Sequence, residues 1–466
     1  MIEIMDTKRH GPSRPRPDSS RPRPDSSRGR TENSYARPEP AKPRPDHKRL
    51  FVNREGTPER KEYFDICRVG EACGSCPRLD DNYNNMLTQK TEDLKKQAAE
   101  GGMGNVLVRD CISSPDTLGY RRTAKLAISS ELRPDFEKPY IAIGLYKQNS
   151  HQVIDVGRCP VQADRLNEVL GFLRGEIGRE GISVYDERTR AGLLRYLVLK
   201  NSLATNQVLI TLVTTSEDPK LKPFARKICE KFSYVNGVTV HINDKSGNAI
   251  FAPDPDSDSL DSGKTIVLAG VDSLSEKLCG LKLRYSSTSF IQVNPALAER
   301  IYFRIIELAG VLPTDTVVDL YCGAGVIGLN LARHATKLIG IEETVSSIQD
   351  ARHNAQQNNI HNAEFFDGRA EDILPKLVAK KHLTKTDVVT LNPSRRGCQP
   401  GVIETVAALA PRTILYMSCS ARTLVRDLKQ FERLGYKTVS LEPFDMFPRT
   451  DHYEVLAHLI PKPAEK

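Results

Sequence analysis

No run of about 18 apolar residues occurs in the 466-residue sequence, so a membrane-spanning helix is not expected. Residues 1–12 also lack the apolar core of a secretory signal, and we therefore expect a cytoplasmic protein without a membrane partner. Ten cysteines in such a chain indicate a reducing compartment, where thiols serve as metal ligands or catalytic groups.

Acidic residues are fewer than basic ones: 59 Asp and Glu against 67 Lys and Arg, which gives a formal net charge of +8. A basic surface attracts polyanions, because each cation placed on a phosphate releases counterions. The balance favours a nucleic-acid partner, although a basic tail on an ordinary soluble protein would produce the same numbers.

The N-terminal region, residues 1–60, is predicted to be a disordered tail. Its sequence RPRPDSS at residues 14–20 repeats at once at residues 21–27, and a partial copy follows at residues 43–46. A segment so rich in proline, with so few large apolar side chains, cannot bury enough surface to offset its chain entropy. The tail could add weak, salt-sensitive attachment to RNA, or it could be dispensable.

Two further domains are predicted from the change in pattern along the chain. Short β-rich runs, such as QVLITLV at residues 207–213, predict an α+β central domain over residues 61–281. Strands and helices then alternate over residues 282–466, beginning with the buried strand TVVDL at 316–320. This alternation predicts a doubly wound, Rossmann-like α/β domain, which binds ligands at the carboxyl ends of its strands.

A glycine loop follows the first of these strands. The segment DLYCGAG at residues 319–325 leads into a helix predicted over residues 328–333, and glycine lets a ligand lie against the main chain. Glu342 ends the next predicted strand, where an acid accepts hydrogen bonds from ribose hydroxyls. With Gly328 the loop also matches the dinucleotide pattern G-x-G-x-x-G, so it does not separate NAD from an adenosyl ligand. A tight turn without any ligand is the plain alternative.

A thiol and a carboxylate stand at predicted strand edges near the C-terminus. Cys419 ends the apolar run at residues 413–417, and Glu454 precedes another apolar run. A nucleophile and a base beside a nucleotide-type loop indicate covalent catalysis on a flat, unreactive ring. The plain alternatives are a buried small hydrophobic Cys and a surface Glu.

These motifs resemble the signatures of the RNA 5-methyluridine methyltransferases, in the same order. They are SFIQVN at 289–294, DLYCG at 319–323, Ser418-Cys419, and DMFP at 445–448. The resemblance implies a class I transferase of EC class 2.1.1 that uses S-adenosyl-L-methionine. It also implies that Cys419 is the nucleophile and Glu454 the base, and that the adenosylmethionine and uracil site is lined by Gln292, Tyr321, Glu342 and Asn392.

The Asn392 motif narrows the implied substrate. Many family members carry Asp at this position and Pro at position 394, where this chain has Ser394. The form Asn-Pro-Ser-Arg-Arg-Gly resembles the branch that lacks an N-terminal TRAM barrel and modifies 23S ribosomal RNA; no such barrel fits into residues 1–60. We therefore expect a monomer acting on an unstacked uridine in a loop of 23S rRNA, with tRNA as the main alternative substrate.

Four cysteines have the spacing of a thiolate metal site. Cys67, Cys73 and Cys76 lie within ten positions, and Cys159 follows far downstream. This pattern suits zinc or an iron–sulfur cluster, and an unligated loop is a third possibility. The family resemblance implies a [4Fe–4S] cluster on these four residues, with a structural role or a role in RNA docking.

Two rival functions are open to test. Cytosine-C5 RNA methyltransferases place a cysteine directly after the proline of the Asn392-Pro393 motif, but Ser394 stands there. A non-catalytic iron–sulfur RNA-binding protein on a decayed methyltransferase fold would not be expected to keep Cys419, Glu454 and the glycine loop together.

Overall fold

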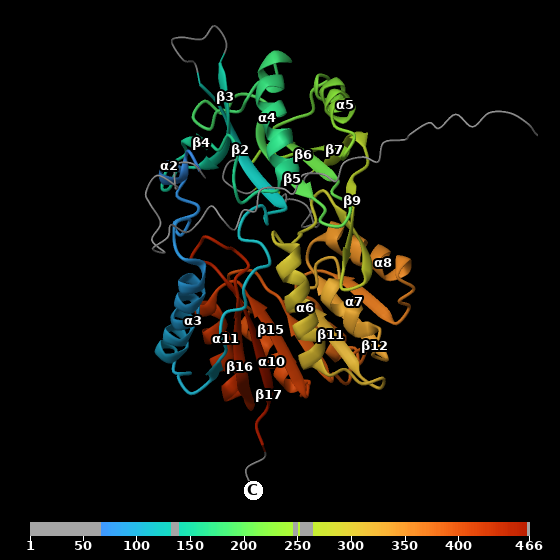
Figure 1. Cartoon of the computed structure of the whole chain (residues 1–466). Helices are drawn as coiled ribbons and strands as arrows, with labels where there is room; N and C mark the ends of the chain where they lie inside the picture. The colour runs from blue at the N-terminus through green and yellow to red at the C-terminus, as the bar shows by residue number, and fades with distance from the viewer. Residues whose placement is uncertain (1–66, 132–138, 246–249, 252–263, 464–466) are drawn as a thin grey trace, which may run out of the picture. The chain divides into compact units, whose positions relative to one another are not determined.

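The computed structural model describes residues 67–131, 139–245, 250–251 and 264–463. The predicted tail of residues 1–60 lies outside the described residues. All described residues belong to one compact unit, Val52–Lys466, which contains two large sheets (Figure 1). The domain boundary predicted after residue 281 stays a prediction.

The C-terminal half forms an eight-stranded sheet in the order β1-β16-β17-β15-β14-β11-β12-β13. Its strands are β1 (Leu107–Val108), β11 (Thr316–Leu320), β12 (Lys337–Glu342), β13 (Ala363–Asp367), β14 (Val388–Leu391), β15 (Thr413–Ser418), β16 (Tyr436–Phe444) and β17 (Glu454–Pro461). The five adjacent strands β15, β14, β11, β12 and β13 run parallel to one another, and β17 is antiparallel to both its neighbours, β15 and β16. The predicted Rossmann-like methyltransferase fold is thus confirmed.

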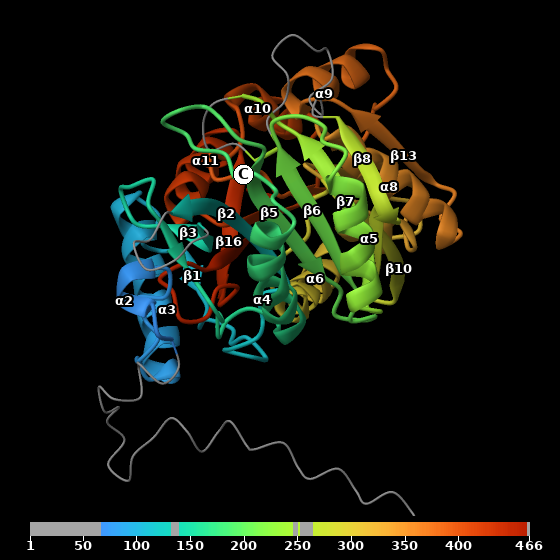
Figure 2. The same ribbon diagram turned by 90° about the horizontal axis from the view of Figure 1, so that it is seen from above.

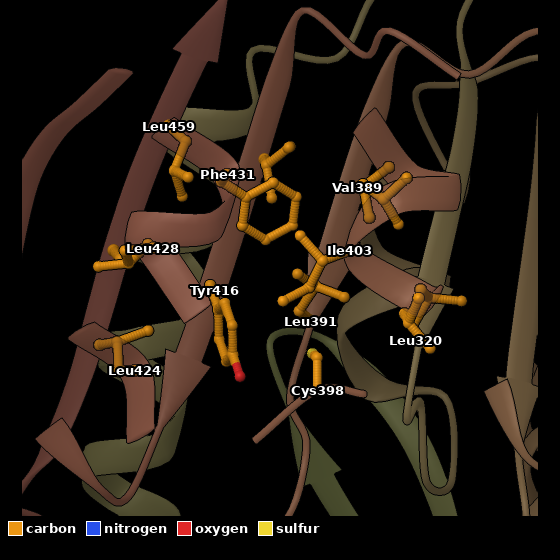
Figure 3. Packing of buried hydrophobic residues seen from close by; sticks show 14 of the residues in the cluster. Leu320, Val389, Leu391, Cys398, Ile403, Tyr416, Leu424, Leu428, Phe431 and Leu459 are labelled. Carbon is orange, nitrogen blue, oxygen red and sulfur yellow. The ribbon is translucent and has the colours of Figure 1, made fainter. Parts of the chain in front are cut away.

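Helices cover both faces of this sheet, because side chains along each strand alternate between two cores. One core packs the sheet against α3 (Tyr83–Glu100), α9 (Ala370–Ala379), α10 (Pro400–Ala408) and α11 (Ala421–Arg433), and Figure 3 shows part of it. The other packs it against α6 (Pro295–Ala309), α7 (Val326–Ala332) and α8 (Val345–Gln357). Val318 and Leu320 point into the first core and Val317 into the second.

The central part forms a seven-stranded sheet in the order β4-β3-β2-β5-β6-β7-β8, antiparallel except for the parallel pair β6–β7. Its strands are β2 (Thr123–Glu131), β3 (Tyr140–Tyr146), β4 (Val153–Asp155), β5 (Leu194–Asn201), β6 (Val208–Thr214), β7 (Val235–Ile242) and β8 (Thr265–Gly270). Helices α4 (Asp164–Arg179) and α5 (Leu221–Lys231) pack on one face, as Figure 2 shows. This is the expected β-rich α+β arrangement.

One hairpin and two helices complete the described fold beside the two large sheets. The hairpin of β9 (Ser273–Leu278) and β10 (Leu281–Ser286) turns through Cys279 and Gly280, both with positive φ. The short helix α2 (Gly70–Cys73) carries part of the cysteine segment, and α3 follows it. Although α3 precedes the central sheet in the chain, its Leu94 and Ala98 pack in the core of the C-terminal sheet, beside α11 (Figure 1).

Candidate active site

A cavity of about 440 Å³ lies at the carboxyl ends of the central parallel strands. Its wall contains all six residues that the sequence singled out for catalysis and cofactor binding: Gln292, Tyr321, Glu342, Asn392, Cys419 and Glu454. The structure therefore brings together side chains that are spread over more than 160 positions of the chain, as the doubly wound topology requires. Their individual roles stay predictions.

The glycine loop is built by backbone conformations that follow strand β11. Tyr321, Gly323 and Gly325 have φ values of 61°, 55° and 83°, and α7 begins at Val326, two residues before the predicted start. Left-handed φ is easy for glycine but uncommon for tyrosine, so Tyr321 is held there by its surroundings. Its side chain is among those that line the cavity.

Asp319 ties this loop to the sheet, a role that the sequence patterns did not reveal. Its Oδ2 accepts a 2.9 Å hydrogen bond from the Gly328 amide, and its Oδ1 accepts one of 2.6 Å from the Thr390 hydroxyl. Burial raises the pKa of Asp319 to about 6, while these hydrogen bonds oppose that rise. One carboxyl group thus joins β11, β14 and the first turn of α7.

Glu342 lies where the dinucleotide pattern predicts an acid, at the end of β12 beside the glycine loop. Its Oε2 accepts a 3.1 Å hydrogen bond from the Gly323 amide, and its Oε1 accepts one of 3.0 Å from the Thr344 amide. The carboxylate is partly exposed and lines the cavity. It can therefore accept further hydrogen bonds from a ribose.

Strand pairing brings Cys419 and Glu454 to the same edge. Ser418, the last residue of β15, pairs with Val455 in the antiparallel strand β17. Cys419, which follows Ser418, therefore lies opposite Glu454, which precedes Val455. Cys419 also precedes Ser420, the N-cap of α11, whose hydroxyl accepts a hydrogen bond from Thr423. The thiol is therefore held between a strand end and a helix start.

Burial dominates the electrostatics of this pair. Glu454 is 5% exposed, and burial raises its pKa to about 8 while Arg395 opposes the rise. Burial and then the neighbouring Glu454 raise the pKa of the Cys419 thiol, and Arg395 lowers it both by its charge and by a hydrogen bond. Arg395 is thus the cation that favours the ionised forms of both groups.

The structure also distinguishes the two neighbouring arginines of the Asn-Pro-Ser-Arg-Arg-Gly motif, Arg395 and Arg396. Arg395 lines the cavity, whereas the carbonyl oxygen of Arg396 accepts a 2.9 Å hydrogen bond from Arg426 of α11. The carbonyl oxygen of Arg395 accepts a further hydrogen bond, of 3.1 Å, from Thr423. Helix α11 therefore orients the loop that presents Arg395.

The four predicted metal ligands line a second cavity, together with Arg121. Burial, together with the charges of Cys159, Cys73 and Cys67, raises the pKa of Cys76 to about 12, so these thiols interact. Arg121 lowers the pKa of Cys76 and Cys159. Even so, no three His, Cys, Asp or Glu side chains among the described residues are arranged to hold a metal ion. The structure thus shows a shared cavity wall and leaves the cluster as a prediction.

Several known proteins are similar in sequence to this chain. Residues 263–461 match the tRNA (Uracil-5-)-methyltransferase family. An uncharacterized RNA methyltransferase of Geobacter sulfurreducens is 35% identical over 398 residues, which cover 85% of this chain and 77% of that protein. The chain belongs to the RNA 5-methyluridine methyltransferase family. A similar protein of Gloeobacter violaceus is 34% identical, over 84% of this chain and 82% of its own length.

A solved structure shares the fold of this chain. The Pyrococcus abyssi tRNA (uracil-54, C5)-methyltransferase, in complex with S-adenosyl-L-homocysteine, superposes with a TM-score of 0.63 at 24% identity, covering 83% of this chain and 85% of that one. The resemblance inferred from the four motifs is confirmed. Within the described residues, no helix is long and apolar enough to cross a membrane.

Proposed function

We propose that this protein forms 5-methyluridine in 23S ribosomal RNA, with S-adenosyl-L-methionine as the methyl donor. The observation that carries the proposal is the meeting of a thiol, Cys419, and a buried carboxyl, Glu454, on the wall of a cavity that also contains the glycine loop. The solved relative with S-adenosyl-L-homocysteine supports the choice of donor.

The residue types fit the chemistry of uracil C5, which is a poor nucleophile. Addition of the Cys419 thiolate to C6 would turn the ring into an enolate, and C5 could then accept a methyl group. Adenosylmethionine supplies that methyl group when bound, and Glu342 and the glycine loop would hold its adenosine part. Glu454 would then remove the C5 proton, and the thiolate would leave from C6.

Three polar groups would prepare this reaction. Arg395 lowers the pKa of Cys419, and the thiolate is the reactive form. Gln292 and Asn392 line the cavity and carry amides that can both donate and accept hydrogen bonds with the edge of a uracil ring. Because C6 is inaccessible inside a helix, the uridine must be unstacked before it enters.

The Asn392 motif and the cysteine pattern support 23S rRNA rather than tRNA as the substrate. The second candidate substrate is tRNA, because the solved enzyme of similar fold is a tRNA methyltransferase. Monomeric state and cytoplasmic location belong to the same proposal. Purified protein should be incubated with unmodified 23S rRNA and tRNA and with methyl-labelled adenosylmethionine, and the modified base mapped. Labelling of 23S rRNA at uridine C5 is expected; labelling of tRNA alone would reject the rRNA assignment.

Two substitutions test the covalent mechanism. Cys419→Ala should abolish methylation, while Cys229→Ala, a cysteine of α5 outside both cavities, should leave it intact. Glu454→Gln should accumulate a protein–RNA adduct, because the C5 proton can no longer be removed, and the surface change Glu404→Gln is its control. Full activity of Cys419→Ala, or normal turnover without adduct in Glu454→Gln, would contradict the assigned roles.

The cysteine cavity would hold a [4Fe–4S] cluster on Cys67, Cys73, Cys76 and Cys159. The donor set fits such a cluster in its chemistry, since four thiols share one cavity wall and a neighbouring arginine favours the thiolates of two of them. The cluster would take no part in methyl transfer and would order this segment or help to dock RNA. Anaerobically purified protein should be brown and contain about four irons per chain; colourless or zinc-containing protein would refute the assignment.

A further inference from the structure

The segment SFIQVN, residues 289–294, forms part of the wall of the candidate active site. Three of its side chains, Phe290, Gln292 and Val293, line the active-site cavity. The segment belongs to no helix or strand, so no regular ladder of backbone hydrogen bonds sets its position. The place of Gln292 in the cavity therefore depends on how the two ends of the segment are held.

The C-terminal end is held by hydrogen bonds on either side of one peptide group. The Arg122 amide, next to β2, donates a 2.8 Å hydrogen bond to the Val293 carbonyl oxygen. The Asn294 side chain donates to the Ser114 hydroxyl at 2.9 Å, and it also caps α6 by accepting a hydrogen bond from the Leu297 amide. These contacts fix the chain from Val293 onward.

Asp350 of α8 holds the N-terminal end. This fully buried carboxylate accepts a hydrogen bond of 2.5 Å from the Ser289 hydroxyl and one of 2.6 Å from the Ser286 amide. The Ser286 hydroxyl is a third donor, at 2.7 Å. Hydrogen bonds to an ionised group are about twice as strong as those between neutral groups, so Asp350 binds both serines firmly.

Lys200 holds the same two serines from the central sheet. It lies on β5, an interior strand between β2 and β6 in which every residue is buried. Its ammonium group donates hydrogen bonds to the carbonyl oxygens of Ser286, at 2.9 Å, and of Ser289. The segment is thus anchored to a rigid strand as well as to a helix of the methyltransferase sheet.

The burial of Lys200 makes this anchor mutual. Burial and then the charge of Lys125 lower the pKa of Lys200 to about 7, while the charge of Asp350 opposes that fall. A buried ammonium group is unfavourable unless hydrogen bonds replace those it made with water. The two serine carbonyl oxygens supply these hydrogen bonds, so the lysine and the segment stabilise each other.

We propose that Lys200 is a positioning residue for methyl transfer: together with Asp350 it fixes the start of the SFIQVN segment and thereby holds Gln292 on the wall of the active-site cavity. The proposal rests on the proposed function, because it assigns Gln292 a task in the reaction. It also gives the central sheet a part in catalysis through a residue that does not touch the substrate.

The test is a double-mutant cycle on the rate of methyl transfer in single turnovers, with the RNA that the wild type modifies. Lys200→Met keeps the length of the side chain but removes its donors, and it should lower the rate between about tenfold and a hundredfold, as a displacement of about 1 Å does. Lys200→Gln, which keeps a shorter donor, should give an intermediate rate. Adding Lys200→Met to Gln292→Ala should change the rate by no more than about twofold, because an absent amide cannot be misplaced.

Hydrogen exchange provides a second measurement that does not depend on activity. Amides of residues 287–294 should exchange about tenfold faster in Lys200→Met than in the wild type, the factor for losing one hydrogen bond to a charged group. The control is Arg195→Met, which removes a second buried cation of β5, one that donates to the carbonyl oxygens of Asn243 and Lys245. It should lower the melting temperature but leave the exchange of residues 287–294 and the single-turnover rate of the folded protein unchanged.

Two results would overturn the positioning role of Lys200. One is wild-type exchange of residues 287–294 in Lys200→Met; the other is an equal loss of rate from Lys200→Met with and without Gln292. The same effects in Arg195→Met would also overturn it, because they would show a general loosening of the central sheet. A wild type that methylates no RNA would instead overturn the proposed function, and hydrogen exchange would still decide whether Lys200 holds the segment.

Discussion

Glu454 should make the protein less stable as the pH rises, because its carboxyl group is buried. Its pKa is about 8 in the folded chain, whereas an unperturbed glutamate has a value of 4.5. Between these values the unfolded carboxyl is ionised while the folded one still holds its proton, so the unfolded state binds fewer protons. The free energy of unfolding must therefore fall as pH rises from about 4.5 to about 8.

The size of this effect follows from the difference between the two pKa values. One pKa unit corresponds to about 1.4 kcal/mol, so ionisation of Glu454 lowers stability by about 3 kcal/mol at pH 7 relative to pH 4. A neutral amide does not titrate in this range. The free energy of unfolding of Glu454→Gln, relative to that of the wild type, should therefore rise by about 3 kcal/mol between pH 4 and pH 7. With an unfolding entropy of about 2.1 cal/mol/K per residue for the compact unit Val52–Lys466, the relative gain is about 4 °C in melting temperature.

Melting temperatures of the ligand-free wild type and Glu454→Gln should be compared from pH 4 to pH 9. The exposed control Glu404→Gln of α10 should follow the wild type at every pH. A constant offset between wild type and Glu454→Gln would refute the reasoning, because it would mean that the carboxyl titrates alike in both states. The methylation rate of the wild type should increase from pH 4 to pH 9, because Glu454 must be ionised to act as a base. Ionisation of the Cys419 thiol also increases the rate as the pH rises, so the apparent pKa of the rate belongs to Cys419 and Glu454 together.

Two structural predictions concern residues that hold the site in place. Lys90→Met should destabilise the protein by about 3–5 kcal/mol, because it leaves Asp445 buried without its 2.5 Å ion pair. Urea unfolding measures this loss of stability. The double variant with Lys90→Met and Asp445→Leu should recover most of the lost stability. If the single and double variants are equally unstable, the ion pair is not the cause. Gly328→Ala should cost about 1–3 kcal/mol and weaken adenosylmethionine binding, because its Cβ would lie 2.8 Å from Oδ2 of Asp319; unchanged calorimetric binding would contradict this.

The ion pair between Lys90 and Asp445 belongs to a set of contacts that hold the segment before Glu454. Lys90 Nζ also donates to the carbonyl oxygen of His452, two residues before Glu454, at 2.9 Å. Arg78 and Arg449 add contacts between the segment that follows the cysteines and the same loop: the Arg78 guanidinium lies 2.6 Å from Asp451, and Arg449 donates to the Asp81 carbonyl oxygen at 2.9 Å. The approach to Glu454 is thus held by residues that lie more than 350 positions earlier in the chain.

Local sequence was sufficient for the elements that carry the site. The short apolar run of β11, the glycine loop and the acid at the end of β12 predicted a ligand site at the strand ends, because a buried strand and the conformations of glycine are encoded locally. The helix start was off by two residues, since the β-branched Val326 and Ile327 have a low helix propensity and give only a weak signal for a first turn. The four motifs also identified the family, which the relatives confirm.

The alternation of strands and helices and the order of the motifs therefore determined the fold class, the family and six of the side chains on the cavity wall. Only the tertiary structure decided how these side chains act on one another. The antiparallel insertion of β17 beside β15 makes Glu454 a neighbour of Cys419, the loop after β14 brings Arg395 to the cavity wall, and α3 reaches across to the loop before Glu454. Burial and pairing at long sequence separation set the charge states of these groups, and no local pattern encodes them.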